Sequence, residues 1–365
     1  MRYRTNKRTG DRVSEIGIGS SYMYEAGAKE AMRALRRAVE GGINYFDLAA
    51  GDGTTFAMYG EALHDLREDV YLQIHFGADY SRGAYGWTLS LEAIKRSVDR
   101  QLRELRTDYI DYGFIHCQDE VSDWETYQDR GVYDYIRALQ SAGVVRHVGL
   151  SSHTPSTIQR ILDDADVDML MFSVNPAYDY GQGEYANGSV DERSAVYRRC
   201  EAEGIGISVM KPFSAGQLLD ARQSPFGCAL TPHQCIRYCL DKPGVLTVLA
   251  GAQSTVEVEA LLSYHGQPED ATDYSVIASF APPTASGRCV YCNHCKPCPA
   301  GIDIGLVNKY YDLAKAGDGM AREHYRGLAR NASDCLHCGH CDSRCPFSVP
   351  QSGRMRMISD FMGAH

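Results

Sequence analysis

Short apolar runs recur along the first 265 residues and alternate with stretches in which apolar residues return every three or four positions. These stretches predict amphipathic helices, for example over residues 28–40, 91–105 and 190–203, and several of them end at glycine, as helix C-termini prefer. The runs have the length and continuous apolar character of buried strands. Eight of them can be counted, over residues 15–19, 44–47, 70–75, 109–116, 147–151, 169–175, 205–211 and 245–251.

Near-continuous apolar strands that alternate with helices are typical of a parallel sheet buried on both faces. Eight such units in one block of 265 residues match a closed barrel better than a doubly wound sheet. We therefore predict a (β/α)8 TIM barrel over residues 1–265. Residues 266–285 are predicted to be a linker, because they are rich in Pro, Ala and Ser at least from Pro282 onward.

Cysteine changes this picture, because eight of the 13 cysteines lie between residues 289 and 345. They form two runs, Cys-x2-Cys-x2-Cys-x2-Cys-Pro from Cys289 and Cys-x2-Cys-x2-Cys-x3-Cys-Pro from Cys335. The second run matches the bacterial [4Fe–4S] ligand run, and the first lacks one residue before its fourth cysteine. Paired CxxC motifs can also hold a structural zinc ion. Two complete four-cysteine runs, each closing in Cys-Pro, favour two [4Fe–4S] clusters.

Residues 286–365 resemble the two-cluster ferredoxin domain, in which the fourth cysteine of each run binds the other cluster. The predicted ligands are Cys289, Cys292, Cys295 and Cys345 for one cluster, and Cys335, Cys338, Cys341 and Cys298 for the other. The apolar spacing between the two runs predicts helices separated by Gly317 and Gly319. We therefore expect a small α-rich domain whose helices pack the cluster loops and limit their access to solvent.

Composition and charge exclude several other classes of protein. The chain has 365 residues, a net charge of −10, 44% hydrophobic and 23% charged residues, which excludes a disordered chain and a general nucleic-acid binder. Neither a signal peptide nor a run of 18 uncharged apolar residues is found, so we expect a cytoplasmic protein with no membrane partner. Grouped cysteines in such a compartment are more often metal ligands than disulfides.

Polar residues stand at the ends of six predicted strands, and barrel enzymes place their chemistry at the C-terminal ends of strands. These ends carry Asp47, His75, His116, Ser151, Ser152, Asn175 and Lys211, and the eighth strand leads into residues Gly251 to Ser254. A core strand has no structural need for a terminal charge or imidazole. The pattern therefore predicts a site at the mouth of the barrel, meaning these strand ends and the loops that follow them.

Several longer motifs surround these strand ends: GGINYFDLAA, LRTDYIDYGFIH, VVRHVGLSSH, VMKPFSAGQLL and TPHQCIRYCLDKPGVLTVLAG. With both cysteine runs they resemble the aldo-keto reductase family, in the branch with a C-terminal two-cluster ferredoxin domain. The resemblance implies an oxidoreductase whose catalytic set is Asp, Tyr, Lys and His. Asp47 and His116 match the Asp and the His. The Tyr position is occupied by the segment 51–53, Gly-Asp-Gly, and the Lys position by His75.

The missing Tyr and Lys weigh against ordinary carbonyl reduction, in which hydride comes from a nicotinamide and a phenol protonates the carbonyl oxygen. Tyr22, Tyr24, Tyr59, or His75 and His116 themselves, are candidates for a substitute acid.

The resemblance also predicts where a nucleotide cofactor would lie. It implies nicotinamide contacts at Ser151, Ser152 and Asn175, and nucleotide contacts at Gly251 and Ser254 after the eighth strand. Glu257 stands near a family arginine that binds the 2′-phosphate, and Gly251 stands near a family lysine. A carboxylate there would repel the phosphate, so NADPH is disfavoured, while NAD(H), a flavin or no nucleotide stay open.

We hypothesise an iron-sulfur oxidoreductase in which a small-molecule substrate at the barrel mouth exchanges electrons with two [4Fe–4S] clusters. Asp47, His75, His116 and Lys211 would handle protons and orientation, and a ferredoxin or flavoprotein is the expected redox partner. Two alternatives stay open. One is a nicotinamide-dependent reductase with a relocated general acid, and the other is a non-catalytic barrel that serves as a scaffold for an electron-carrier domain.

Overall fold

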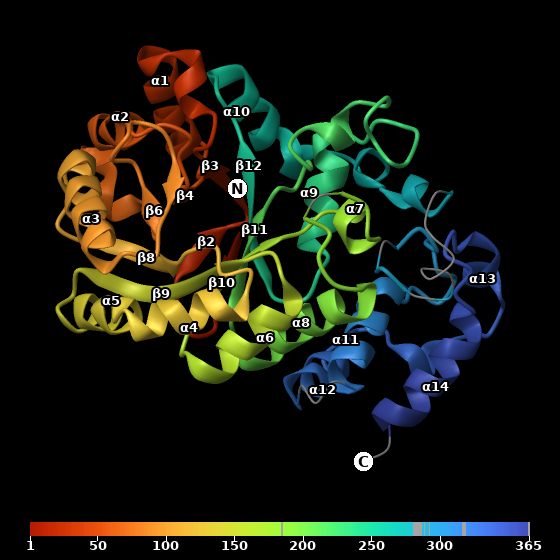
Figure 1. The fold of residues 1–365 in the computed structure, drawn as a ribbon. Helices are drawn as coiled ribbons and strands as arrows, with labels where there is room; N and C mark the ends of the chain where they lie inside the picture. Colours follow the sequence, from red (N-terminus) through yellow and green to blue (C-terminus); the bar gives the residue numbers. More distant parts are fainter. Residues whose placement is uncertain (184, 280–286, 288, 292, 316–318, 364–365) are drawn as a thin grey trace.

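In the computed structural model, eight parallel strands close into a barrel surrounded by helices (Figure 1). The structure describes residues 1–183, 185–279, 287, 289–291, 293–315 and 319–363. The barrel strands are β3 (Ile16–Gly19), β4 (Tyr45–Asp47), β5 (Tyr71–Phe76), β8 (Ile110–Ile115), β9 (Val145–Ser152), β10 (Met169–Ser173), β11 (Gly206–Met210) and β12 (Val245–Gly251). They follow one another round the barrel in chain order, and β12 pairs with β3 to close it. Each lies within or overlaps one of the eight predicted runs, so the predicted barrel is confirmed.

Helices follow the strands as the periodicity predicts. They are α1 (Ala28–Glu40), α2 (Thr55–Leu63), α3 (Leu91–Leu105), α4 (Val121–Asp129), α5 (Val132–Ser141), α6 (Pro155–Asp164), α7 (Pro176–Asp179), α8 (Val190–Glu203), α9 (Pro232–Leu240) and α10 (Thr255–Leu262). The three helices named from the sequence have the predicted bounds. The reason is local: α8, for example, begins at a capping box of Ser189 and Glu192 and ends at Gly204 in the left-handed conformation.

Two antiparallel hairpins interrupt the alternation, and the sequence pattern predicts neither. The first, β1 (Tyr3–Thr5) and β2 (Arg12–Ser14), precedes the barrel, and its Val13 packs with the apolar side chains that fill the barrel interior. The second, β6 (Ala78–Asp79) and β7 (Gly86–Trp87), follows β5 at the mouth. It places residues 80–85 over the strand ends, which matters for the site described below.

Short 3-10 helices complete the barrel region and continue beyond it. They cover Met23–Ala26, His64–Asp69, Gln217–Leu219, Ser263–Gly266, Glu269–Thr272 and Ser275–Ser279. Tyr274 and Ile277 are buried against the barrel core, and the Tyr274 ring meets the Tyr238 ring edge-on at 5.1 Å. The rest of the predicted linker, residues 280–285, lies outside the described residues. The boundaries at 265 and 286 therefore stay a prediction.

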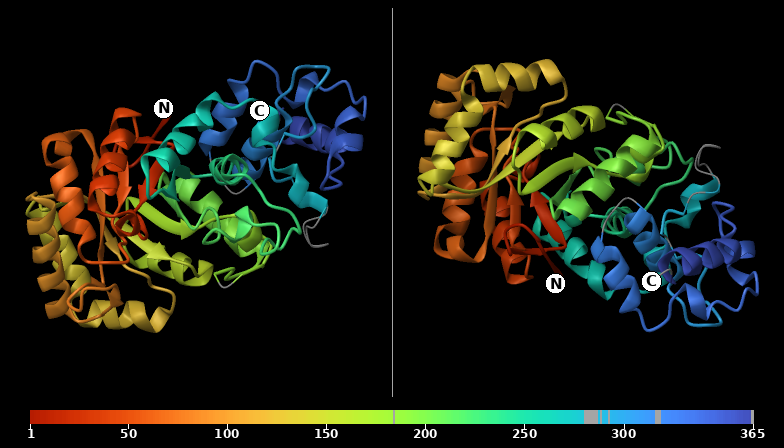
Figure 2. Two further views of the ribbon diagram at one scale, coloured as in Figure 1. Left: turned by 90° about the horizontal axis from the view of Figure 1, so that it is seen from above. Right: turned by 90° about the horizontal axis from the view of Figure 1, so that it is seen from below.

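The C-terminal part of the chain forms a second, α-rich unit with its own small core. Its helices are α11 (Ile304–Lys315), α12 (Gly319–Arg326), α13 (His340–Arg344) and α14 (Gln351–Gly363), with a 3-10 turn at Ala332–Asp334. The two predicted helices between the cysteine runs are α11 and α12; Gly319 begins α12, and Gly317 lies outside the described residues. Helix α11 lies beside α8 of the barrel (Figures 1 and 2). Within the described ranges, no helix is long and apolar enough to cross a membrane.

Candidate functional site

A buried hydrogen bond between Asp47 and His75 joins two neighbouring strand ends at the mouth. Asp47 ends β4 and is 3% exposed, and His75 lies on the adjacent strand β5 and is 1% exposed. The His75 Nε2 atom lies 2.7 Å from Asp47 Oδ1. The Gln73 amide lies 3.1 Å from the same nitrogen, and an amide can turn to present either its oxygen or its nitrogen. A carboxylate at the shorter distance implies that Nε2 carries a proton.

The Asp47–His75 hydrogen bond extends through two further hydrogen bonds to the surface of the mouth. His116 directly follows β8, and its Nδ1 lies 3.0 Å from His75 Nδ1. The Tyr85 hydroxyl lies 2.7 Å from His116 Nε2. We call these four residues, Asp47, His75, His116 and Tyr85, the mouth chain. It begins in the protein interior and ends on a side chain that is 43% exposed.

Tyr85 reaches His116 because its loop pairs with residues 51–53, the segment that follows β4. Asp52 and Ala84 form an antiparallel bridge, the Tyr85 amide donates to the Gly51 carbonyl at 3.1 Å, and the Gly53 amide donates to the Gly83 carbonyl at 2.7 Å. A Cβ atom on Gly51 would lie 2.5 Å from the Ser21 carbonyl oxygen, so this close approach requires glycine.

The tyrosines considered from the sequence lie elsewhere. Tyr59 is buried on α2, packs edge-on against Phe46, and its hydroxyl has no hydrogen-bond partner among the described residues. Tyr22 and Tyr24 are exposed on and beside the 3-10 helix after β3. Sequence reasoning missed Tyr85. The one signal in the sequence is its place between Gly83 and Gly86 in the turn-forming stretch SRGAYGW.

Lys211 lies apart from the mouth chain. It follows β11 with a positive φ of 56°, and its ammonium group lies over the Tyr185 ring, 4.1 Å from the centroid. Its carbonyl oxygen accepts a hydrogen bond from Asn175. The structure thus brings three of the four predicted catalytic side chains into one hydrogen-bonded array and leaves the fourth across the barrel, at the end of β11.

The polar groups predicted to contact a nicotinamide bond to the protein itself. Ser151 Oγ accepts from the Cys117 amide at 3.2 Å, and Ser152 Oγ donates to Asp119 at 3.1 Å. Asn175 caps α7, because its Oδ1 accepts from the Tyr178 amide at 2.9 Å. These hydrogen bonds hold the strand ends and their loops in place. Contact of these three residues with a nicotinamide stays a prediction.

Asp119 organises a second polar cluster at the mouth. It accepts hydrogen bonds from the backbone and Nδ1 of His153 as well as from Ser152. These bonds, above all those to His153, outweigh burial and lower the pKa of Asp119. Cys117 lies beside it, with ligand atoms of Cys117, Asp119 and His153 all within 4.8 Å. Burial and the Asp119 charge raise the pKa of Cys117 to about 12, so this thiol is protonated at neutral pH.

The loop after β12 carries acidic groups. Gly251 is exposed, and Ser254 caps α10 by accepting from the Glu257 amide at 3.3 Å. The Glu257 carboxylate is exposed and accepts from the Gln253 amide at 2.6 Å. Two further carboxylates, of Glu25 and Glu30, bond to Gln253 and Thr255 of the same loop. Three acidic side chains therefore surround the predicted nucleotide site.

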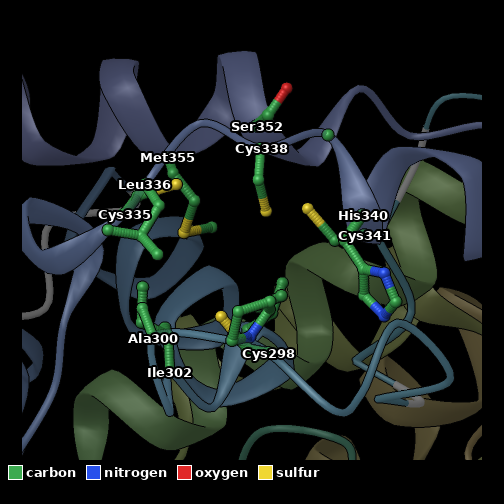
Figure 3. Close-up of a pocket in the computed structure, with 13 residues that line it drawn as sticks. Cys298, Ala300, Ile302, Cys335, Leu336, Cys338, His340, Cys341, Ser352 and Met355 are labelled. Carbon is green, nitrogen blue, oxygen red and sulfur yellow. The ribbon is translucent and has the colours of Figure 1, made fainter.

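One cavity of the C-terminal unit brings together four predicted cluster ligands. Cys298 comes from the first cysteine run, and Cys335, Cys338 and Cys341 come from the second. Figure 3 shows the sulfur atoms of Cys338 and Cys341 pointing toward the same space, across from Cys298. Burial, Asp342 and the neighbouring Cys335 and Cys298 raise the pKa of Cys341 to about 11.

The walls of this cavity suit a cubane cluster. They are otherwise mostly apolar, formed by Pro299, Ala300, Ile302, Ile304, Leu336 and Met355, with Gly339, His340 and Ser352. Four thiols on a largely apolar wall form the donor set of a [4Fe–4S] cluster and provide the low-polarity surroundings that tune it. The residues present therefore fit the group.

The other predicted ligand set is described only in part, because Cys292 lies outside the described residues. Cys289 and Cys345 pack against the large barrel core, and Cys295 packs in the small core of the C-terminal unit. The Gln351 amide lies 3.5 Å from Cys289 Sγ. Cys289 and Cys345 thus lie on the side of the C-terminal unit that meets the barrel.

A second cavity opens between the two units beside Cys289. Its barrel side is formed mainly by the end of α7 and by α8 and α9, and its other side by residues 289–291. Asp179, the last residue of α7, is buried there and accepts hydrogen bonds from three side chains. These donors are Arg193, Tyr197 and Tyr238. Helix α7 therefore runs from the mouth, where Asn175 caps it, to this interface.

Comparison with known proteins places both units. A model of the Aldo/keto reductase family matches residues 15–229, and a model of a 4Fe-4S dicluster domain matches residues 285–349. The uncharacterized oxidoreductase YqkF of Bacillus subtilis is 25% identical over 265 residues, which cover 66% of this chain and 83% of that protein. The L-glyceraldehyde 3-phosphate reductase of Escherichia coli O157:H7 is 26% identical over 306 residues, which cover 77% of this chain and 85% of that protein.

Solved structures share the barrel fold. The holo form of an aldo-keto reductase from Bacillus halodurans superimposes with a TM-score of 0.62 at 23% identity, covering 77% of this chain and 97% of that one. An aldo/keto reductase from Klebsiella pneumoniae in complex with NADP and acetate superimposes with a TM-score of 0.57 at 18% identity, covering 78% and 97%.

Proposed function

The chain belongs to the aldo/keto reductase family and carries a 4Fe-4S dicluster domain, and we propose that it moves electrons between its two clusters and a small carbonyl substrate at the barrel mouth. Family membership makes it an oxidoreductase. The carbonyl class is supported by the relative that reduces L-glyceraldehyde 3-phosphate. A one-electron carrier protein, such as a ferredoxin or flavoprotein, would supply or remove the electrons.

The observation that carries this proposal is the short link between the mouth and a predicted cluster ligand. Helix α7 begins at Asn175 on the mouth, and Asp179 and Tyr180 at its far end share a cavity with Cys289. A helix rises about 1.5 Å per residue, so these four helical residues bridge roughly 6 Å. This helix connects the β10 end of the mouth to the cavity beside a predicted cluster ligand, a connection that a barrel acting only through a nicotinamide would not need.

The two ligand sets proposed for the clusters are the crossed ones. Cys335, Cys338, Cys341 and Cys298 would hold one cluster, and Cys289, Cys292, Cys295 and Cys345 would hold the other. When bound, such clusters store and pass single electrons. Reduction of a carbonyl to an alcohol takes two electrons and two protons. Two singly reduced clusters together supply the two electrons. The carbonyl oxygen receives its proton from a residue of the mouth, and the carbonyl carbon receives its proton from water.

The surface over the fully described cavity offers a place for the electron carrier. Cys338 is exposed, and the side chain of its neighbour Leu336 is 66% exposed. Residues 286–365 carry ten Lys and Arg against seven Asp and Glu, although the chain as a whole is acidic. A net positive charge on the unit that holds the clusters favours an acidic carrier, whose approach would weaken as salt rises.

The direct test uses the holoprotein, purified without oxygen and reduced with titanium(III) citrate. After the excess reductant is removed, addition of DL-glyceraldehyde or another small aldehyde or ketone is expected to reoxidise the clusters and to yield one alcohol for every two electrons lost. The proposal would be wrong if the clusters stayed reduced while NADH drove the same reduction. That result would favour a nicotinamide-dependent reductase. If neither the reduced clusters nor NADH drives the reduction, the result would favour the non-catalytic scaffold.

The loop after β12 gives a separate prediction about the cofactor. NADPH is expected to bind at least about tenfold more weakly than NADH, if either binds, because the carboxylates of Glu257, Glu25 and Glu30 repel the additional phosphate. Fluorescence titration of the holoprotein with each nucleotide measures the two affinities.

The matched variants are Glu257→Arg and, as a control on the opposite face of the barrel, Glu68→Arg. The first should strengthen NADPH binding several-fold and leave NADH binding unchanged, as expected for one exposed charge. The second should change neither. Tighter binding of NADPH than of NADH by the unaltered protein would contradict the electrostatic argument.

A further inference from the structure

The hydrogen bonds of the mouth chain accommodate an imidazolium at His75. His75 uses both ring nitrogens, Nε2 toward the Asp47 carboxylate at 2.7 Å and Nδ1 toward His116 Nδ1 at 3.0 Å. A hydrogen bond between two imidazole nitrogens requires one donor and one acceptor. When His75 is an imidazolium it donates at both ends. His116 then accepts at Nδ1 and carries its proton on Nε2, where it donates to the Tyr85 oxygen.

This arrangement leaves the Tyr85 phenol with its own proton directed away from His116. The neutral ring of His116 is consistent with its surroundings, because burial and the neighbouring His75 and His153 rings hold the pKa of His116 well below its usual value. Asp119 acts in the opposite direction, and its effect is the smallest. The groups that face His116 are His75 on β5, Tyr85 on the hairpin, Cys117 and Asp119 after β8, and His153 after β9.

From this geometry we propose that Tyr85 donates the proton to the carbonyl oxygen of the substrate, fed by the imidazolium of His75 through His116. The proposal rests on the proposed function of the mouth, since it concerns the substrate bound there. It assigns the acid to a residue outside the family motif, on a hairpin that follows a different strand. Tyr85 is the catalytic residue, and Asp47, His75 and His116 are positioning residues that supply its proton.

The proton balance closes without any further group. The Tyr85 O–H bond breaks as the substrate oxygen gains a proton, and the Tyr85 oxygen takes the Nε2 proton of His116. His116 Nδ1 in turn takes the Nδ1 proton of His75, which becomes neutral and keeps Nε2–H on Asp47. The chain loses one proton in total and no electron, and solvent restores that proton. In the direction of alcohol oxidation the same three bonds shift in reverse.

The relay explains how Tyr85 can act as an acid although its phenol has a raised pKa. Burial, with the charges of Cys117, Tyr185 and Asp119, raises the pKa of Tyr85, which makes the isolated phenol a weak acid. In the family pattern a lysine would stabilise a phenolate. In the mouth chain no phenolate has to form, because the proton that leaves Tyr85 is replaced along a hydrogen bond of 2.7 Å.

The test compares Tyr85→Phe with the control Tyr22→Phe, a substitution on the exposed loop after β3. Both are prepared as anaerobic holoproteins and assayed with reduced methyl viologen and DL-glyceraldehyde. Tyr85→Phe is expected to lower kcat by about 10²- to 10⁴-fold with little change in KM, because only proton transfer is lost. Tyr22→Phe should retain the kcat of the unaltered protein.

A kcat for Tyr85→Phe equal to that of Tyr22→Phe would overturn the assignment of the acid while leaving the proposed function intact. Absence of turnover by the unaltered protein with every carbonyl tested would overturn both.

A second measurement reads the relay without turnover. Nitrogen-15 NMR of histidine-labelled holoprotein with oxidised clusters is expected to show His116 neutral with its proton on Nε2, from about pH 6 to about pH 8. A His116 ring that becomes charged in this range would overturn the relay, because it would then donate from both nitrogens and could not accept from His75. The unaltered chemical shifts of the other histidines in Tyr85→Phe would show that the variant is folded.

Discussion

Replacing Asp47 with asparagine is expected to abolish most turnover while leaving the iron content of the protein unchanged. The Asp47 carboxylate is 3% exposed and lies 2.7 Å from His75 Nε2, so in the proposed relay it is the negative charge that balances the His75 imidazolium. An amide can accept the same hydrogen bond but cannot balance the charge. His75 then becomes neutral, cannot donate at both ends, and no longer feeds His116. We expect kcat to fall by about 10²- to 10⁴-fold.

The variant also tests whether the ion pair matters for folding. Losing one charge of a buried hydrogen-bonded pair costs about 1–3 kcal/mol, so the melting temperature should fall while the protein stays folded at room temperature. The matched control is Asp163→Asn, which alters an exposed carboxylate paired with Arg199 on the barrel surface. Its kcat and iron content should equal those of the unaltered protein. An active Asp47→Asn variant would contradict the assignment of the mouth to proton transfer.

The second large effect is expected from the cysteine cavity, where Cys341→Ala should remove one cluster. Cys341 is buried and lines the cavity with Cys298, Cys335 and Cys338. A cubane that loses one of four protein thiolates binds far more weakly, because the metal-thiolate bonds also hold the surrounding loops in place. Iron and sulfide should each fall from about eight to about four per chain, with the barrel still folded by circular dichroism.

Three further variants make this result specific. Cys298→Ala belongs to the other cysteine run in sequence but lines the same cavity, so its remaining cluster should give the same electron paramagnetic resonance spectrum as that of Cys341→Ala. Cys345→Ala should retain the opposite cluster and give a different spectrum. Cys228→Ala, in the barrel, should keep about eight irons. If instead Cys345→Ala gives the spectrum of Cys341→Ala and Cys298→Ala gives a different one, each run binds its own cluster.

Most of the fold could be predicted from the sequence because its signals are local. A strand buried on both faces must be apolar along its whole length, and the eight apolar runs each overlap one barrel strand. The helix over residues 190–203 was predictable to the residue, since the capping box that starts it and the glycine that ends it stand directly at its two ends in the sequence. The two short hairpins were not, because strands of two or three residues carry too little pattern to be recognised.

The candidate site was predictable only where it lies on strand ends. Asp47, His75 and His116 end three neighbouring strands, and a barrel brings neighbouring strand ends together, as the hydrogen bonds between them show. Lys211 also stands at a strand end, yet its side chain lies over Tyr185. Strand order predicts where the backbone lies, and it does not predict the direction of the side chain.

The sequence by itself determined the barrel, the two cysteine runs and the three buried residues of the mouth chain, because each depends on spacing along the chain or on the order of the strands. Only the tertiary structure decided which tyrosine completes that chain. Tyr85 reaches His116 through backbone hydrogen bonds between residues 83–85 and 51–53, and such pairing depends on how two loops fold onto each other. It likewise decided that Cys298 shares a cavity with cysteines about 40 residues away, because loop packing and not sequence distance brings their sulfur atoms together.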